Sequence, residues 1–446
     1  MVLMTEKRKA SREKTKAYRI KSVTILFMTL FLTCTDHDDP IQNDKITLTY
    51  WSANNQYEMD LAAKLVLEWN EKYPDVQVKH QPIPESRSSE EVILASVVGK
   101  KTPDVYSNMW PGDVALYVRA NVLENLDQFV DFDSLANDRY DPEKYKESKH
   151  NDGHVYQILW KTNPIMLIYN KKIFKEAGYE NPPETYAEYL DLAEKVSKDT
   201  NGDGYVDRWV GITQILVTWW QRFFDYYTLY IAATGGKTFL EGDSVTFNNE
   251  MSVQVYRFLQ TLFKKNYFPL ERMDARADVF LHSIVASRFT GPWEITHAEK
   301  FKPEGFEFDF APVPRPAKSG GPSYTYGDYK SIVIFKNTKY PQESWEFVKY
   351  LVSKKADLQL LQSTDQLPVR KNILSDSLFQ PYFENNPMML RFAKQAQFVR
   401  GVDSSPVLRE IFDAISQEFE ACVIYGKKTP EEAVENAARR AKLVME

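Results

Sequence analysis

The chain has 446 residues, which is too long for one hydrophobic core, since single cores stop growing at roughly 250–300 residues. At least two lobes are therefore expected. Its 62 acidic side chains outnumber the 56 basic ones, and the formal net charge is -6. An acidic chain is a poor nucleic-acid binder, so partners of that class are excluded from the expectations that follow.

The first 33 residues have the pattern of a secretory signal peptide. Lys and Arg side chains are dense between residues 7 and 21, and an apolar run follows from Val23 to Leu32. About ten apolar residues are too few to span a bilayer. Cys34 comes directly after Phe31-Leu32-Thr33, which resembles a relaxed bacterial lipobox. We expect export to the bacterial cell envelope (the periplasm or the outer face of the cytoplasmic membrane) and a lipid anchor at Cys34. Ordinary signal cleavage nearby is the alternative.

Residues 34–44 would then form the lipidated N-terminus and a solvated acidic tether. Loss of residues 1–33 removes eight basic and two acidic side chains, so the formal charge goes from -6 to -12. The other cysteine, Cys422, would be an unpaired thiol buried in a C-terminal helix. Disulfides are therefore not expected to hold this exported protein together.

Residues 45–106 predict alternating strands and helices. Residues 45–51 alternate between apolar and polar side chains, as in a strand, and Leu61, Leu65 and Trp69 have helical spacing. Further strands are expected at 76–79 and from 103, with a helix around 90–98. This order predicts right-handed crossovers and a parallel sheet.

The rest of the chain continues as an α/β protein. A strand is expected at 165–169, helices at 186–197 and 218–233, and another strand at 332–335. Residues 341–352 predict a helix because Pro341 suits its first turn. The tail predicts helices at 408–425 and 430–444.

A loop with alternating oxygen-bearing side chains follows the helix expected at 186–197. Such side chains at every second position can converge on one hard cation, and Gly204 at the sixth position permits the required turn. The twelfth position holds Val210 instead of the bidentate Glu of an EF-hand, which predicts a lone structural Ca²⁺ site. The alternative is a polar surface turn that binds nothing. The expected ligands are Asp199, Asn201, Asp203, the backbone carbonyl of Tyr205, and Asp207.

Several segments in fixed order resemble the extracellular solute-binding proteins of ABC importers, in the sugar-binding group that includes the maltose-binding proteins. They include ITLTYWSAN, TPDVYSNMWPGDVALYVRANVLENLDQF, GHVYQILWKTNPIMLIYNKKIFKEAG, SRFTGPWEI, FEFDFAPVPRP, YPQESWEFVKYLVS and QLPVRKNI. The most distinctive are Pro292-Trp293 and Tyr169-Asn170-Lys171. Together the segments span essentially all of residues 45–446.

The resemblance implies a periplasmic-binding-protein type II fold, in which two α/β lobes close over a ligand about a hinge of several segments. Matching segments place lobe 1 at residues 45–160 and 331–374, and lobe 2 at 161–330 and 375–446. The resemblance further implies a monomer that binds a sugar or oligosaccharide, closes, and delivers it to the permease subunits of an ABC importer.

Ligands of open α/β sheets lie beyond the carboxyl ends of the parallel strands, so the candidate residues come from those loops and from the crossover segments. Aromatic rings there can stack on the C–H face of a pyranose, and polar side chains can pair with its hydroxyls. Packing is the alternative for each tryptophan, and a helix-capping or hinge role for Asp328. The candidates are Ser52, Asn54, Asn108, Trp110, Trp160, Trp219, Trp293, Tyr326 and Asp328.

No catalytic motif is present in the sequence: G-x-S-x-G, the phosphate-binding P-loop and H-E-x-x-H are all missing. We therefore expect a binding protein without catalytic residues. Two alternatives remain open. One is a secreted, calcium-stabilised glycoside hydrolase or polysaccharide lyase, in which Glu294 and Asp328 could serve as the carboxylates. The other is a glycan-capturing lipoprotein of an uptake or sensing complex without an ABC importer.

Overall fold

The structure begins where the alternation of the sequence predicts a strand. β1 (Ile46–Ser52) turns Leu48 and Tyr50 inward, and both side chains are buried. The computed structural model describes residues 45–86, 88–271, 273, 278–318 and 320–446. The predicted signal peptide, Cys34 and the tether lie outside the described residues.

Lobe 1 is built on a six-stranded sheet with the order β12-β4-β11-β3-β1-β2. The strands β1, β2 and β3 are parallel, as the sequence predicts, but β11 runs antiparallel to both β3 and β4. The parallel arrangement predicted for residues 45–106 is thus confirmed, and the sheet becomes mixed where β11, which reaches it from lobe 2, inserts between β3 and β4. The other strand bounds are β2 (Val76–Pro82), β3 (Val105–Met109), β4 (Ile158–Thr162), β11 (Lys330–Ile334) and β12 (Leu367–Pro368).

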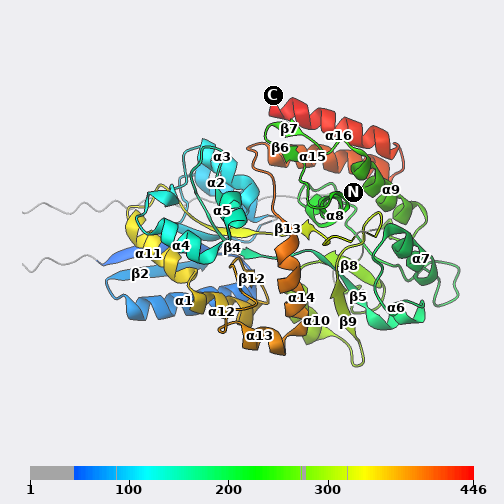
Figure 1. Ribbon diagram of the computed structural model, residues 1–446, viewed down its shortest axis with the longest axis horizontal. Coiled ribbons are helices and arrows are strands. Elements are labelled where there is room, and N and C mark those ends of the chain that lie inside the picture. Colours follow the sequence, from blue (N-terminus) through cyan, green and yellow to red (C-terminus); the bar gives the residue numbers. More distant parts are fainter. Residues whose placement is uncertain (1–44, 87, 272, 274–277, 319) are drawn as a thin grey trace, which may run out of the picture. The chain divides into compact units, whose positions relative to one another are not determined.

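Helices cover both faces of this sheet (Figure 1). Side-chain caps begin three of them: Asn55 accepts from Glu58 N, Ser88 from Glu91 N and Asp141 from Lys144 N. Leu61, Leu65 and Trp69 are buried, as their helical spacing predicts. The lobe 1 helices are α1 (Gln56–Lys72), α2 (Ser89–Val98), α3 (Pro111–Arg119), α4 (Phe132–Arg139), α5 (Pro142–Ser148), α11 (Pro341–Leu351) and α12 (Lys354–Thr364), with a 3-10 turn at Leu126–Gln128.

Lobe 2 is built on a three-stranded antiparallel sheet in which β5 (Met166–Asn170) lies between β8 (Ser287–Thr290) and β9 (Phe308–Ala311). Capping boxes begin two of its helices, at Thr185 with Glu188 and at Thr429 with Glu432. Helices α9, α15 and α16 pack against one another (Figure 1).

The remaining elements of lobe 2 are α6 (Lys171–Glu176), α7 (Tyr186–Val196), α8 (Thr228–Thr234), α9 (Glu250–Lys264), α10 (Trp293–Phe301), α13 (Gln380–Asn385), α14 (Pro387–Gln395), α15 (Leu408–Phe419), α16 (Pro430–Met445), π-helical segments at Phe223–Tyr227 and Glu420–Ile424, a 3-10 turn at Ala396–Phe398, and a hairpin of β6 (Leu240–Glu241) and β7 (Ser244–Val245).

Three described segments pass between the lobes. One joins β4 to β5, one leads from β10 (Thr325–Tyr326) to β11, and one leads from β12 to α13. The first two are bonded to each other, since Ile165 N donates to Tyr326 O at 2.9 Å and Asp328 N donates to Asn163 O at 3.0 Å. β10 also pairs with β13 (Val399–Arg400). These bonds tie the crossing segments into one hinge region.

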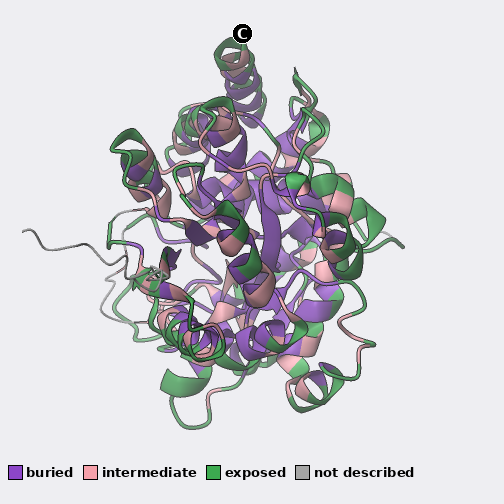
Figure 2. Cartoon of the chain, turned by 90° about the vertical axis from the view of Figure 1, so that its left-hand side faces the viewer, coloured by how far each residue is buried: buried purple, intermediate pink, exposed green. Residues whose placement is uncertain are grey.

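The strands are buried, while the helices carry exposed side chains on their outer faces (Figure 2). Trp345 lies in the core of lobe 1, as its place on an amphipathic stripe predicts. Cys422 is a free, buried thiol in the C-terminal helical region, which confirms that prediction. Among the described residues, no helix has both the length and the apolar character needed to cross a membrane.

Candidate ligand-binding cleft

A cavity of about 330 Å³ opens between the lobes and is rich in aromatic side chains. We call it the aromatic compartment. Four predicted site residues meet there, from both lobes and from the hinge: Trp110, Trp219, Tyr326 and Asp328. Its full lining is Ser88, Ser89, Glu90, Trp110, Trp219, Trp220, Phe223, Phe224, Tyr326, Asp328 and Lys330.

Trp110 is carried by lobe 1 but packs into lobe 2. It follows β3 directly and forms the N-cap of α3, yet its ring belongs to the main hydrophobic cluster of lobe 2. Its centroid lies 5.1 Å from that of Trp219 and 5.3 Å from that of Phe223. Gly112 leaves the space that this ring fills, because a Cβ at residue 112 would lie 2.5 Å from Cζ2 of Trp110.

A glycine also leaves the space that the ring of Trp293 fills. Its ring folds back over Gly291, where a Cβ would lie 2.6 Å from Cε3 of the indole. The ring stands at a T-shaped angle to Phe224, with centroids 6.2 Å apart, and is partly buried. Trp293 therefore does not line the aromatic compartment itself but packs against Phe224, which does.

An ion pair crosses the cleft beside the tryptophans. Arg409 Nε on α15 donates to Asp113 Oδ1 on α3 at 2.8 Å, and Arg409 Nη2 bonds the other carboxylate oxygen. The Arg409 guanidinium also lies 5.4 Å from the ring centroid of Trp219. Burial raises the pKa of Asp113 to about 6, although the nearby Arg409 favours the ionised form.

The floor of the cleft is polar and continuous with the hinge. Asp328 accepts hydrogen bonds from Tyr326 Oη and Lys330 Nζ, each at 3.1 Å. Behind it, Lys161 Nζ lies 2.5 Å from Glu58 Oε2, and both side chains are buried. Burial by itself would raise the pKa of Glu58, but Lys161 and Gln366 lower it overall. Burial lowers the pKa of Lys161, although the neighbouring Glu58 opposes that shift.

Besides Trp293, four predicted residues lie outside the lining of this compartment. Trp160 was expected on a crossover and available to a ligand, but it lies within β4, is 3% exposed, and packs in the core of lobe 1. Ser52 is buried, and its Oγ bonds His80 Nε2 at 2.8 Å. Asn54 is exposed and Asn108 is partly buried, and neither lines the compartment.

Sequence reasoning missed several residues that the structure places here. Glu90 and Lys330 line the compartment, and Asp113 and Arg409 form an ion pair between α3 and α15. Each is a charged side chain on or near a helix or strand, where the sequence pattern indicates an ordinary solvated position. The signal that identifies them is the contact between lobes, which sequence spacing does not contain.

A second, larger cavity of about 910 Å³ is lined by residues of both lobes. Pro111 and Val114 of α3 form part of its wall, and Tyr230 and Arg400 line it from lobe 2. Gln157 also lines it, and its Oε1 is buried without a hydrogen-bond partner. We call it the larger cavity.

The predicted calcium loop is exposed, and its residues form hydrogen bonds with one another. Both carboxylate oxygens of Asp199 accept backbone N–H groups, including that of Gly204 at 2.7 Å, and these bonds lower its pKa. Asp207 accepts from Thr200, and Asp203 accepts from the N–H of Tyr205. The turn at Gly204 has the left-handed φ that the pattern requires. The loop thus has the expected backbone path, and Ca²⁺ binding stays a prediction.

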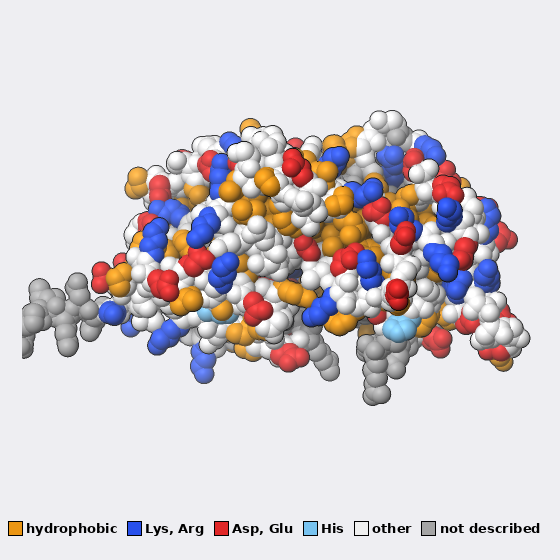
Figure 3. Space-filling model, turned by 90° about the horizontal axis from the view of Figure 1, so that it is seen from below, with side chains coloured by type: hydrophobic (Ala, Val, Ile, Leu, Met, Phe, Trp, Pro, Cys, Tyr) orange, Lys and Arg blue, Asp and Glu red, His pale blue; other side chains and the backbone are white. Residues whose placement is uncertain are grey.

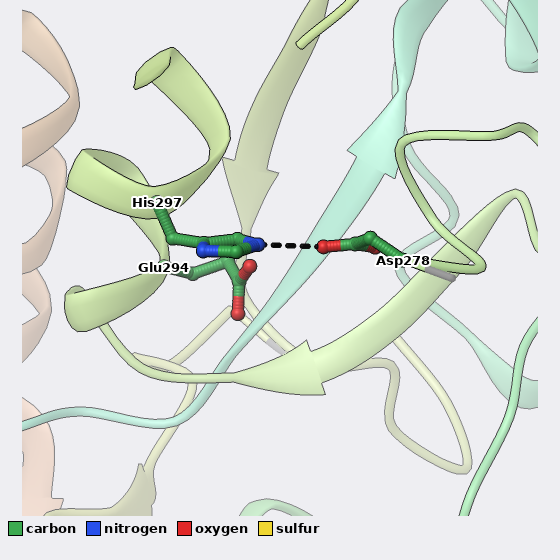
Figure 4. A group of neighbouring side chains, drawn as sticks. All are labelled: Asp278, Glu294 and His297. Carbon is green, nitrogen blue, oxygen red and sulfur yellow. Dashed lines mark hydrogen bonds and ion pairs between the residues drawn. The ribbon is translucent and has the colours of Figure 1, made fainter. Parts of the chain in front are cut away.

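Another group of possible metal ligands lies beside Trp293. Asp278, Glu294 and His297 place their ligating atoms within 4.8 Å of one another, with His297 Nε2 2.9 Å from Asp278 Oδ2 (Figure 4). Arg288 already bonds Glu294 and lies 3.8 Å from Asp278. This cation neutralises the carboxylates, so the group is an ion-pair network that fixes the start of α10.

The carboxylates that a hydrolase would need are both paired with cations, Glu294 with Arg288 and Asp328 with Lys330. On the face drawn in Figure 3, basic and acidic side chains are interspersed, and hydrophobic side chains gather near the middle. That face offers no basic surface of the kind that nucleic acids bind.

The sequence pattern of the bacterial extracellular solute-binding proteins matches residues 64–388, which is more than half of the chain. The chain belongs to this family. The match confirms the resemblance seen in the sequence.

Three relatives illustrate the range of the family. The maltotriose-binding protein of Pyrococcus abyssi is 24% identical over 369 residues, which are 82% of this chain and 75% of that protein. The sn-glycerol-3-phosphate-binding periplasmic protein of Yersinia pseudotuberculosis is 25% identical over 319 residues, 68% of this chain and 69% of the relative. An ABC substrate-binding protein of Listeria monocytogenes, solved with cycloalternan, is 20% identical with a TM-score of 0.74, covering 90% of this chain and 99% of the other. That likeness confirms the expected two-lobed fold.

Proposed function

We propose that this protein captures a sugar or short oligosaccharide between its lobes and delivers it to an ABC importer. The observation that carries the proposal is the aromatic compartment, to which both lobes and the hinge contribute. Trp110 comes from lobe 1, Trp219 from lobe 2, and Tyr326 from a crossing segment. A ligand held there contacts both lobes at once and therefore favours the closed state.

The chemistry of the compartment suits a saccharide. Indole and phenyl rings offer flat apolar surfaces for the C–H face of a pyranose, and Asp328, Lys330, Glu90 and two serines offer donors and acceptors for hydroxyl groups. The sugar ligands named for the Pyrococcus and Listeria relatives agree with this choice. The phosphate ester named for the Yersinia relative is a different class, and it serves as a comparison ligand in the test.

The proposal includes export, with lipidation of Cys34 holding the mature, monomeric protein at the membrane near its permease. It also includes a structural Ca²⁺ in the loop from Asp199 to Asp207, which the left-handed turn at Gly204 supports. We further propose that the protein is not an enzyme, because the carboxylates nearest the cleft are neutralised by Lys330 and Arg288.

A thermal-shift screen of residues 45–446 against mono- and oligosaccharides, with glycerol 3-phosphate included, tests the main proposal. The ligand is recovered afterwards and analysed by mass. A sugar that raises the melting temperature and returns intact supports sugar capture. Shorter fragments would establish a hydrolase or lyase instead. A shift with glycerol 3-phosphate alone would replace the sugar by a phosphate ester.

A further inference from the structure

Trp220 lines the aromatic compartment without taking part in the packing of the protein. Its side chain is half-buried, and it belongs to none of the hydrophobic core clusters of the described residues. The neighbouring Trp219 packs against Trp110 and Phe223, whereas Trp220 makes no aromatic or cation–π contact within the part of the chain that the structure describes. The ring of Trp220 is therefore available to a ligand.

The same compartment contains a carboxylate without a counter-ion. Glu90 lies in the first turn of α2, lines the compartment and forms no ion pair within the described residues, which do not include Arg87. Each of the other carboxylates of the cleft and its floor has a basic partner: Asp113 with Arg409, Asp328 with Lys330, and Glu58 with Lys161. The described charged groups of the cleft therefore leave the negative charge of Glu90 in excess.

The charge of Glu90 is felt in both lobes and in the hinge. Burial is the main cause of the raised pKa of Asp113 and of Tyr326, and Glu90 adds to both shifts. Burial lowers the pKa of Arg409 in lobe 2, but Asp113 and Glu90 are among the groups that raise it overall. A carboxylate that acts on all of these residues lies centrally in the cleft, where it attracts a cation.

We propose that the ligand of this cleft is a saccharide with a protonated amino group, and that Glu90 and Trp220 hold this group. The carboxylate accepts a charge-assisted hydrogen bond from the ammonium, and the indole adds cation–π attraction, for which tryptophan is the best ring. Glu90 belongs to lobe 1 and Trp220 to lobe 2, so an ammonium group held by both favours the closed state. This inference rests on the proposed function, since it names the substrate class of the same site.

An ammonium group suits Glu90 better than a neutral hydroxyl does. Closure removes water from the cleft, and a carboxylate that loses water without gaining an opposite charge is costly. The rest of the compartment still fits a pyranose, because Ser88 and Ser89 offer hydroxyl groups and the rings offer flat apolar faces. Arg409 already lies 5.4 Å from the ring centroid of Trp219, so an aromatic ring of this compartment accepts a cation in the protein itself.

The test compares sugars that differ in a single group. Isothermal titration measures the affinities of glucosamine, galactosamine and mannosamine, each with its parent hexose and its N-acetyl derivative, at about pH 6, where an aliphatic amino group is protonated. The members of each set share one ring and differ only at C2. The wild type should bind the best hexosamine at least about tenfold more tightly than its parent hexose. The N-acetyl derivative, which keeps the nitrogen but loses the charge, should lose this advantage.

Glu90→Gln removes the charge and keeps the shape of the side chain. It should bring the affinities for hexosamine and hexose to within about threefold of each other, with the affinity for the hexose almost unchanged. Glu91→Gln is the matched control, because Glu91 lies in the same turn of α2 but is exposed and does not line the compartment. It removes the same charge from the same end of the helix and should keep the preference of the wild type.

Trp220→Leu tests the aromatic half of the site. Leucine keeps an apolar side chain but has no π face, so the affinity for the hexosamine should fall at least about threefold. Thermal melting checks that each variant is folded. An unchanged affinity in Trp220→Leu would contradict the role of Trp220.

Two results would overturn the inference while the proposed function stands. One is a wild type that binds the hexosamines no more tightly than the neutral sugars of the screen. The other is a Glu90→Gln variant that keeps the preference of the wild type for the amino group. A wild type that binds neither amino sugars nor neutral sugars would instead overturn the proposed function, and this inference with it.

Discussion

Replacing Gly112 by alanine should disturb the ligand site more than the fold. The new Cβ would lie 2.5 Å from Cζ2 of Trp110 and closer still to two other ring carbons, so the indole must leave its position. Overpacking of this kind costs about 1–3 kcal/mol. Gly112 is helical with an ordinary φ, so the higher helix propensity of alanine offsets up to about 1 kcal/mol of this cost. The net loss of stability should stay below about 2 kcal/mol.

The effect on binding should be larger than this stability change suggests. A displaced indole no longer offers its face to a sugar, and the contact with Trp219 is lost as well. We expect affinity for the best sugar of the screen to fall at least tenfold, which is about 1.4 kcal/mol. Titration calorimetry measures the affinity, and thermal melting measures the fold.

Gly321→Ala is the control for this experiment, since a Cβ there meets nothing within 4 Å and the φ is not left-handed. It should leave both affinity and melting temperature unchanged. An unchanged affinity in Gly112→Ala would refute the role of Trp110 in the site. A variant that no longer folds would show that the first turn of α3 is needed for the fold, and would contradict the expectation that the change acts mainly on binding.

Three further predictions concern single side chains. Trp293→Ala should weaken sugar binding more than tenfold while the far-ultraviolet circular dichroism stays the same; unchanged affinity would remove Trp293 from the site. Asp203→Ala should lower the melting temperature in calcium and abolish its response to chelator, and a wild type that ignores chelator would contradict the calcium site. Asp113 should make stability depend on pH. Burial raises its pKa in the folded protein to about 6, so the folded state holds a proton that the unfolded state releases. Its stabilising contribution is therefore complete below about pH 4 and is lost as the pH rises through 6. Denaturant unfolding at pH 5 and pH 7 should show a loss on the order of 1 kcal/mol that Asp113→Asn removes. Equal slopes for wild type and variant would mean that Asp113 titrates normally.

The local elements could be predicted from the sequence because their signals are local. The alternation at 45–51 and Pro341 identify β1 and α11, and the structure has both. The prediction that Trp160 is available to a ligand is wrong for a physical reason. Every residue of β4 is buried, so the strand has no alternation that would distinguish it from an apolar crossover segment. Its antiparallel partner β11 lies far along the chain, and no periodicity near residue 160 reports that pairing.

The sequence predicted which types of residue form the candidate site, but not how the structure arranges them. Aromatic side chains in loops beyond the strands indicated Trp110 and Trp219, and the structure brings their rings together. Arg409 could not be found in this way, because a single charged residue on the amphipathic helix α15 has the pattern of a solvated position. Its partner on α3 is almost 300 residues away, and only the docking of the two lobes joins them.

The contact between Trp110 and Trp219 also explains why such a site can bind its ligand without holding it too tightly. In this structure the two rings already contact each other, so a sugar that stacks there exchanges ring–ring contact for ring–sugar contact. Only the difference between these contacts contributes to affinity, together with the hydrogen bonds to the polar floor. Tyr326 and Asp328 belong to a segment that passes between the lobes, so those hydrogen bonds act on the hinge itself. Closure and binding therefore draw on the same residues, which favours an affinity near micromolar, about -8 kcal/mol, and permits release to a transporter.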